Sequence, residues 1–337
     1  MKDPRGQNIA RRLALDADVI IENYRPGILE KWNLGFDELK KENPATIMLR
    51  LSGYGQTGPM KDQSGFGAIG EAMGGMRYVS GHPDRPPVRI GISIGDSVAA
   101  LHGVIGAMMA LRHRDATGGR WNGKTGPDCA GGQGQMVDVV LYEAVLNMMQ
   151  SLVPEFDYAG VVRERTGGAL PGIVPSNTYT TCDGQNIVIA GNGDAIFRRL
   201  MIAIGLDDMA NDPQLARYDG RVPRTVEIDE AIQHWCSGHD IEAALTTLKA
   251  ADVPVGKIYS VQYMMSDPQY LSRKMFEEHR FPDGTPFKMP AVTPKLSETP
   301  GGTTWLGPKL GEHNHEILSA LGYDDHTIAQ LARDRII

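Results

Sequence analysis

The sequence predicts an α/β protein with a parallel sheet in a large domain and a second, smaller α+β domain. Helix-like and strand-like segments alternate near the start of the chain, as in parallel sheets covered by helices. The 40 glycines and 21 prolines cluster in turns between short apolar segments. A chain of 337 residues exceeds one ordinary core, so we expect two domains.

The opening elements alternate in type. The sequence predicts a helix over Asn8–Asp16, a buried strand over Asp18–Tyr24, a helix over Ile28–Glu42 and an apolar strand over Thr46–Ser52. Loops that leave the carboxyl ends of parallel strands usually bind the ligand. We therefore expect the site in the loops that follow the two strands.

The later elements define the domain boundaries. An apolar helix follows Asp96, a hydrophilic glycine-rich tract covers Thr117–Gly134, and a helix is expected over Leu141–Leu152. From about Asn177 the pattern changes to strand, Asp-Gly turn, strand and then helices. The predicted division is a first part of the large domain over 1–170, a small domain over 177–265 and a return to the large domain over 266–337.

Composition excludes several classes of partner. A net charge of -7 argues against nucleic acid and anionic membranes, because both require a basic surface. We found no apolar stretch long enough to span a bilayer and no leader-like start. Cys129, Cys182 and Cys236 show no CxxC spacing, which fits a reducing cytoplasm, and Cys182 and Cys236 are expected to pack as small apolar residues.

Asp96 is the most informative residue of the chain. It ends the run Arg89-Ile90-Gly91-Ile92-Ser93-Ile94-Gly95-Asp96 and opens an apolar helix, so its carboxylate lies at a helix N-terminus. Free N–H groups there keep a carboxylate ionised, and an ionised carboxylate can act as a nucleophile. On spacing alone, the simpler interpretation is that Asp96 caps the helix.

Six runs, in this order, resemble the family III CoA-transferases of the CaiB/BaiF type, which include formyl-CoA transferase and carnitine CoA-transferase. These runs are Ala17–Gly27, Gly53–Pro59, Gly95–Ser97, Gly134–Val139, Val253–Gly256 and Leu310–His313. The resemblance implies transfer of CoA between short carboxylic or dicarboxylic acids, with CoA as a substrate and no permanently bound cofactor. It also implies a nucleotide-type large domain and an interlocked homodimer.

The resemblance assigns Asp96 the role of nucleophile. Asp96 would attack the donor thioester to give a mixed anhydride, and the released CoA thiolate would then give an aspartyl-CoA thioester. The acceptor acid would take CoA by the reverse steps. The site must supply backbone N–H groups for the oxyanion and must exclude water.

The resemblance also implies the binding residues. Asn23, Tyr24 and Arg25 fall where the family contacts CoA, and Lys31 would suit the CoA phosphates. Gly167 and Gly168 lie where family members carry a glycine loop that closes over the intermediates. Without the resemblance, Lys31 is a solvated helix residue and the glycine pair is an interdomain linker.

The segment Gly65-Phe66-Gly67-Ala68-Ile69-Gly70 spells GxGxxG, but no apolar strand precedes it, so nicotinamide binding is disfavoured. By resemblance, Gly65, Phe66 and Gly67 line the acyl-CoA channel. Racemases of this fold carry a His-Asp pair here for moving the α-proton. Phe66 and Gly67 therefore disfavour an acyl-CoA racemase, which remains the alternative within the fold.

The chain departs from the family pattern in two places. The resemblance begins after the family's opening βαβ unit, which holds part of the CoA site. We therefore expect poor solubility of the isolated chain, and a non-catalytic CoA-binding remnant remains a second alternative. An insertion over Gly119–Gly131 reads as a surface loop. His313 and His315 form an HxH pair without further ligands nearby, so no metal site is expected.

Overall fold

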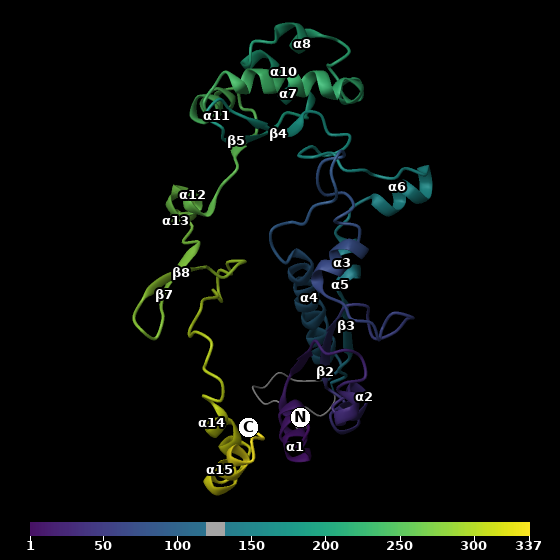
Figure 1. Cartoon of the computed structure of the whole chain (residues 1–337), viewed down its shortest axis with the longest axis vertical. Coiled ribbons are helices and arrows are strands. Elements are labelled where there is room, and N and C mark those ends of the chain that lie inside the picture. The colour runs from purple at the N-terminus through teal and green to yellow at the C-terminus, as the bar shows by residue number, and fades with distance from the viewer. Residues whose placement is uncertain (119–131) are drawn as a thin grey trace. The chain divides into compact units, whose positions relative to one another are not determined.

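A computed structural model describes residues 1–118 and 132–337 (Figure 1). The predicted insertion at Gly119–Gly131 and Cys129 lie outside the described residues. The chain divides into two compact units, unit 1 with Met1–Gly167 and Lys309–Ile337, and unit 2 with Gly168–Pro308. The sequence-based division placed the return to the large domain at residue 266, whereas unit 1 resumes at Lys309.

Unit 1 contains a parallel sheet of three strands in the order β1-β2-β3, which confirms the predicted parallel sheet. The strands are β1 (Val19–Glu22), β2 (Ile47–Ser52) and β3 (Met136–Val140). The central strand β2 is almost wholly buried, as expected for a strand with neighbours on both sides and helices on its faces. The sheet thus brings the carboxyl ends of β1 and β2 to one edge, where their loops meet.

The helices of unit 1 alternate with its strands as predicted, but two of the predicted helices differ from the observed ones. They are α1 (Pro4–Asp16), the 3₁₀ turn η1 (Glu30–Trp32), α2 (Phe36–Glu42), α3 (Gly67–Met73), α4 (Ile94–Ala116), α5 (Leu141–Asn147), α6 (Leu152–Ala159), α14 (Asn314–Ala320) and α15 (Asp325–Arg333). The predicted helix over Ile28–Glu42 is wrong, because Asn33 adopts a left-handed conformation with φ 54° and separates η1 from α2. The predicted helix over Leu141–Leu152 likewise ends at Asn147.

Helix α4 carries Asp96 in its first turn, and it is longer than the apolar helix that the sequence predicts after Asp96. By length and composition alone its 23 residues could cross a bilayer, which corrects the statement that no stretch is long enough. A single such helix is weak support for a membrane span. Val98 and Ala99 of α4 instead pack into a core with Leu49 of β2 and Val139 of β3. Five apolar side chains of α4 remain exposed: Leu101, Val104, Ile105, Met108 and Met109.

Unit 2 begins with the predicted hairpin and helices. Its elements are β4 (Ser176–Thr180), β5 (Asn186–Ala190), α7 (Asp194–Ala203), α8 (Asp207–Asn211), α9 (Tyr218–Arg221), η2 (Val222–Arg224), α10 (Thr225–Ser237), α11 (Ile241–Ala250), β6 (Val255–Lys257), α12 (Val261–Ser266), α13 (Pro268–Ser272), β7 (Phe276–Arg280) and β8 (Pro286–Pro290). Strands β4, β5 and β6 form an antiparallel sheet, and β7 pairs with β8. Cys236 is buried in this unit as expected, but Cys182 is exposed, so the prediction that it packs in the core is wrong.

Candidate functional site

Asp96 lies in a cavity of unit 1 at the carboxyl edge of the parallel sheet. The cavity has a volume of about 400 Å³ and is lined by Asn23, Leu51, Ser52, Gly53, Gly65, Phe66, Gly67, Ala68, Arg89, Asp96 and Leu141. Its walls come from the ends of β1 and β2, the start of α3 and the start of α4. The structure therefore brings Asn23, Gly65, Phe66 and Gly67 together with Asp96, although these residues are distant in sequence.

The position of Asp96 differs from that of a helix cap. Helix α4 begins at Ile94 with Ser93 as its N-cap residue, so Asp96 is the third residue of the first turn. Its side chain is exposed to the cavity and accepts no hydrogen bond from the described residues. The N–H groups of a first turn have no partner within their own helix. Asp96 thus presents a free carboxylate beside backbone donors and the positive end of the α4 dipole.

Two glycines allow the starts of α3 and α4 to touch. A Cβ atom at Gly67 would lie 2.1 Å from Oδ2 of Asp96, and one at Gly95 would lie 2.9 Å from the carbonyl oxygen of Gly67. Real side chains do not approach so closely, so any larger residue at either position requires a shift. The GxGxxG segment therefore makes room for Asp96, and turn residues, not an apolar strand, precede it.

A second cavity of about 210 Å³ adjoins the first and shares Asn23, Ser52, Gly53, Gly65 and Phe66 with it. Its other lining residues are Tyr24, Arg25, Pro26, Lys61, Gln63 and Ser64. The loops after β2 and before α3 meet here, since a Cβ at Gly53 would lie 2.7 Å from the Cα of Gly65. Arg25 donates a hydrogen bond to the hydroxyl of Ser64 across this junction. Two cations, Arg25 and Lys61, thus line one end of a continuous hollow and Asp96 the other.

Buried charges at the end of β1 hold the Asn23–Arg25 loop. Glu22 is 6% exposed, and its Oε2 accepts a hydrogen bond from the backbone N–H of Tyr24 at 2.7 Å. Its Oε1 accepts from Nε of Arg50 at 2.5 Å, and Nη1 of Arg50 also donates to Glu30 at 2.6 Å. Burial alone would raise the pKa of Glu30, but the hydrogen bonds from Arg50 bring that pKa below its ordinary value.

Three predicted residues do not line either cavity. Lys31 is exposed in η1. Gly167 and Gly168 lie in a turn at the boundary of the two units, where Gly167 has φ +69° and its N–H donates to the carbonyl of Gly81 at 2.9 Å. A role for this glycine loop in closing over intermediates stays a prediction.

Sequence reasoning missed two cations that the structure places in the hollow, Lys61 and Arg89. Lys61 follows the turn residues Gly58 and Pro59, and Arg89 precedes the Gly91–Asp96 run. The sequence signal that could have identified them is their position next to loops that were predicted to bind the ligand. Neither residue falls in a run that resembles the family.

The histidine pair His313 and His315 lies at the start of α14. No group of three or more His, Cys, Asp or Glu side chains able to hold a metal ion occurs in residues 1–118 and 132–337. Nε2 of His315 lies 2.9 Å from Oδ1 of Asp325, and His313 is the residue that precedes α14. The HxH pair therefore belongs to the local structure around α14 and α15.

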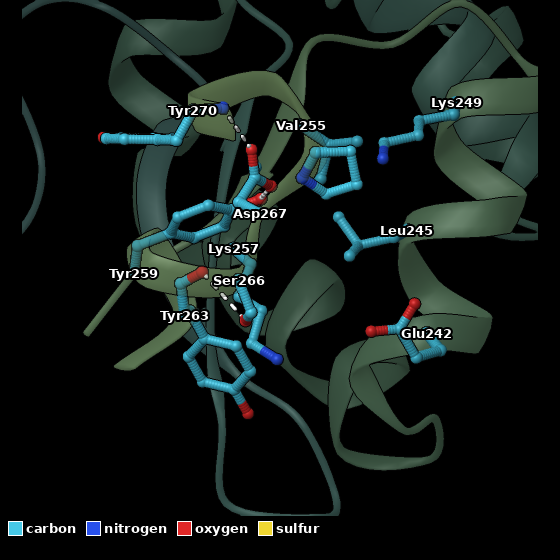
Figure 2. A pocket seen from close by; sticks show the side chains of 12 residues that line it. Glu242, Leu245, Lys249, Val255, Lys257, Tyr259, Tyr263, Ser266, Asp267 and Tyr270 are labelled. Atoms are coloured by element: carbon cyan, nitrogen blue, oxygen red, sulfur yellow. Dashed lines mark hydrogen bonds between the residues drawn. The ribbon is translucent and has the colours of Figure 1, made fainter. Parts of the chain in front are cut away.

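Unit 2 has a larger cavity of about 610 Å³ between α11 and the segment that includes β6, α12 and α13 (Figure 2). Glu242, Leu245 and Lys249 of α11 face Tyr259 and Tyr263 across it. The hydroxyl of Tyr259 donates to Asp267 at 2.7 Å, and Nζ of Lys257 lies 3.6 Å from the ring centre of Tyr263. Several of its polar groups are thus already paired within the unit, and the cavity contains no residue that the resemblance assigns to the site.

Comparison with known proteins identifies the family. A model described as CoA-transferase family III matches residues 1–314. The chain is 44% identical over 338 residues to a succinyl-CoA--D-citramalate CoA-transferase of Chloroflexus aurantiacus, an alignment that covers 100% of this chain and 81% of the relative. It is 30% identical to a succinate--glutarate CoA-transferase of Agrobacterium fabrum, over 95% of this chain and 76% of the relative.

A solved structure supports the same assignment. A CAIB/BAIF family protein from Brucella suis superposes with a TM-score of 0.78 and 29% identity, over 95% of this chain and 79% of that one. Sequence and fold therefore agree over nearly the whole chain, and the protein belongs to CoA-transferase family III.

Proposed function

We propose that this enzyme moves CoA from an acyl-CoA thioester to a second carboxylic acid, with Asp96 as the covalent carrier. The names of its relatives support CoA transfer between acids, with succinyl-CoA as the donor to test first. The observation that carries the proposal is the free carboxylate of Asp96 in a cavity joined to one lined by two cations.

In the first half-reaction, a carboxylate oxygen of Asp96 attacks the thioester carbon and the C–S bond breaks, so CoA leaves as a thiolate. The thiolate then attacks the aspartyl carbon of the mixed anhydride, the donor acid leaves as a carboxylate, and an aspartyl-CoA thioester remains. The acceptor carboxylate attacks the same aspartyl carbon and releases the thiolate. Attack of the thiolate on the acceptor acyl carbon completes the product and restores Asp96.

The surroundings of Asp96 suit these steps. Each addition creates negative charge on a carbonyl oxygen, and the backbone N–H groups of the first turn of α4 are donors fixed beside that point. Phe66 supplies an apolar wall to the same cavity. Gly67 leaves space for the Asp96 carboxylate beside the start of α3, and Gly65 lets its loop approach Gly53.

The adjoining cavity suits the polar part of CoA. Arg25 and Lys61 supply positive charge for phosphate groups, and the ring of Tyr24 is held edge-on against Trp32 at 5.5 Å between centres. We propose that Asn23, Tyr24 and Arg25 contact CoA, with Lys61 in place of Lys31, which lines neither cavity.

A homodimer is part of the proposal. The five exposed apolar residues of α4, Leu101, Val104, Ile105, Met108 and Met109, are consistent with a face that another chain covers. Light scattering of the purified protein tests this point, and a monodisperse monomer contradicts it.

The mechanism is tested by the intact mass of the protein after incubation with succinyl-CoA, with and without hydroxylamine. The expected result is a CoA adduct without hydroxylamine and a hydroxamate with it, both mapped to Asp96 and both lost in Asp96→Ala. A CoA adduct elsewhere, or one that persists in the variant, overturns the covalent role of Asp96. Deuterium wash-in at the α-carbon without CoA transfer supports the racemase alternative instead.

A further inference from the structure

We propose that Arg89 binds the distal carboxylate of a dicarboxylic acyl group in the Asp96 cavity, and that the buried Glu71 holds Arg89 in place. This inference rests on the proposed function, since it names the class of acid that the same site accepts. The reacting carbonyl would lie at Asp96 and the second carboxylate of the substrate at the guanidinium group.

Arg89 is the one cation among the described residues that line the Asp96 cavity. Arg25 and Lys61 lie in the adjoining cavity, where they suit phosphate groups. An acyl group that carries a second carboxylate brings a negative charge into a space that already holds the carboxylate of Asp96. A cation in that space is therefore needed for such a substrate to bind.

Glu71 of α3 is a buried acid that points to Arg89. It is 1% exposed, and its Oε2 lies 3.4 Å from Nε of Arg77 and 3.8 Å from Nε of Arg89. Its Oε1 is buried without a hydrogen-bond partner among the described residues. A buried carboxylate needs compensating charge, so Glu71 favours conformations in which both arginines stay close.

The packing of Glu71 ties it to the nucleophile. Gly95 precedes Asp96, and a Cβ atom at Gly95 would lie 3.1 Å from Cγ of Glu71. Glu71 thus lies directly beneath the helical turn that carries Asp96. Arg89 approaches Glu71 through Nε, and its two Nη groups make no hydrogen bond with the described residues. These Nη groups form the planar fork that pairs with a carboxylate through two hydrogen bonds.

The two carboxylates have separate roles in this arrangement. Glu71 positions the guanidinium group from below, and the substrate carboxylate completes its pairing from the cavity. A monocarboxylic acyl group of equal length leaves the fork unpaired and in contact with an apolar chain end. A site built to bind a polar group strongly rejects a substrate analogue without that group. The loss of one methylene group from a substrate has a much smaller effect on binding.

The test compares succinyl-CoA with butyryl-CoA, in which a methyl group replaces the carboxylate. Hydroxamate formation on Asp96 without an acceptor acid ends after one turnover, so its rate at varied donor concentration gives single-turnover values of kcat and KM for the donor half-reaction alone. We expect Arg89→Gln to lower kcat/KM for succinyl-CoA about 100-fold and to change that for butyryl-CoA less than about threefold. Arg77→Gln is the matched control, because Arg77 also contacts Glu71 but does not line the cavity.

Glu71→Gln tests the positioning role. It should raise KM for succinyl-CoA about tenfold with a smaller change in kcat, because the fork is present but less well held. Equal losses with both donors in Arg89→Gln, or the same loss of selectivity in Arg77→Gln, overturn the inference.

A binding measurement separates this inference from the proposed function. Calorimetric titration of free succinate and butyrate in the presence of CoA requires no turnover. Succinate binding that disappears in Arg89→Gln but persists in Asp96→Ala and Arg77→Gln supports the role of Arg89 even if no transfer occurs. Unchanged succinate binding in Arg89→Gln overturns that role even if Asp96 proves to be the nucleophile.

Discussion

The carboxylate of Asp96 occupies the space in which a side chain at Gly67 would begin. A Cβ atom at Gly67 would lie 2.1 Å from Oδ2 and 2.6 Å from Cγ of Asp96. Gly67 is also the first residue of α3, and its backbone conformation is not left-handed, so alanine can adopt it. The contact therefore constrains the position of the Asp96 carboxylate and not the folding of the helix.

We expect Gly67→Ala to lower kcat about 100-fold, because the added methyl group displaces the Asp96 carboxylate from the cavity. The free energy of unfolding should change by less than about 1 kcal/mol, since alanine is a better helix former than glycine. Steady-state CoA transfer and urea denaturation measure the two quantities.

Gly91→Ala is the matched control for this change. A Cβ at Gly91 would meet nothing within 4 Å, so we expect kcat to stay within about twofold of the unchanged protein. Full activity in Gly67→Ala would show that Asp96 does not act from its observed position.

The buried pair of Glu22 and Arg50 gives a prediction about the loop that carries Asn23, Tyr24 and Arg25. Their side chains are 3% and 5% exposed, and Glu22 also accepts the N–H of Tyr24. Arg50→Met should lower the free energy of unfolding by about 3–5 kcal/mol, because it leaves Glu22 buried and unpaired. It should also raise KM for acyl-CoA, because the loop that carries Tyr24 and Arg25 loses its anchor.

The double variant Arg50→Met with Glu22→Gln separates pairing from packing. Removal of both charges should restore part of the lost stability, as judged by the urea midpoint. Lys41→Met serves as a surface control, because Lys41 pairs with Glu38 in the open, and it should cost less than about 1 kcal/mol. A double variant no more stable than the single one contradicts the account.

Much of unit 1 could be predicted from the sequence because its signals are local. Short apolar runs located β1 and β2, and the apolar stretch after Asp96 located α4. The break at Asn33 was missed because a left-handed asparagine inside a helix-like pattern leaves no periodic signal. The apolar length of α4 was underestimated because the helix starts two residues before Asp96 and ends at Ala116.

The cations of the candidate site were harder to predict, because tertiary folding brings them to it. The family resemblance assigns Lys31 to the CoA phosphates, but η1 leaves it exposed outside both cavities. Lys61 lines the smaller cavity because the loop between β2 and α3 folds back, so that Gly53 and Gly65 touch.

Two buried charges, Glu71 and Arg221, were also not predicted, because composition alone assigns charged side chains to the surface.

Arg221 stabilises the interior of unit 2. It is 0% exposed and donates to the carbonyls of Val174 at 3.2 Å and Leu215 at 3.1 Å. It also pairs with Asp194 at 2.7 Å and lies 4.9 Å from the ring centre of Phe197. Arg221→Met should cost about 3–5 kcal/mol of unfolding free energy, because buried carbonyls lose their donors.

The matched control for this change is Arg217→Met. Arg217 has a side chain that is 84% exposed, so its loss should cost less than about 1 kcal/mol. Urea denaturation of both variants makes the comparison. Equal stabilities of the two variants contradict a structural role for Arg221.

The thiol of Cys236 makes the stability of the protein depend on pH at the alkaline end. Burial raises the pKa of this thiol from 9.0 to about 11. Between these values the folded protein keeps the proton while the unfolded chain releases it. The folded state then binds more protons than the unfolded state, so the free energy of unfolding falls as pH rises from about 9 to about 11.

Cys236→Ala should remove this contribution to the fall of the unfolding free energy at alkaline pH. The difference in unfolding free energy between the unchanged protein and the variant should therefore shrink by about 1 kcal/mol between pH 8 and pH 10. Burial and a hydrogen bond to Asp229 also raise the pKa of Tyr179, and charge on Cys236 adds to that rise, so the comparison stops at pH 10, the ordinary pKa of a tyrosine. Urea denaturation at pH 8, 9 and 10 gives the required values.

Ile232→Val is the control for the cavity that Cys236→Ala leaves. Ile232 belongs to the same buried cluster as Cys236 and carries no ionisable group. Its truncation should cost about 1 kcal/mol at every pH, so that its curve runs parallel to that of the unchanged protein. If the Cys236→Ala curve is also parallel, the thiol does not hold its proton across this range, and the alkaline loss of stability has another source.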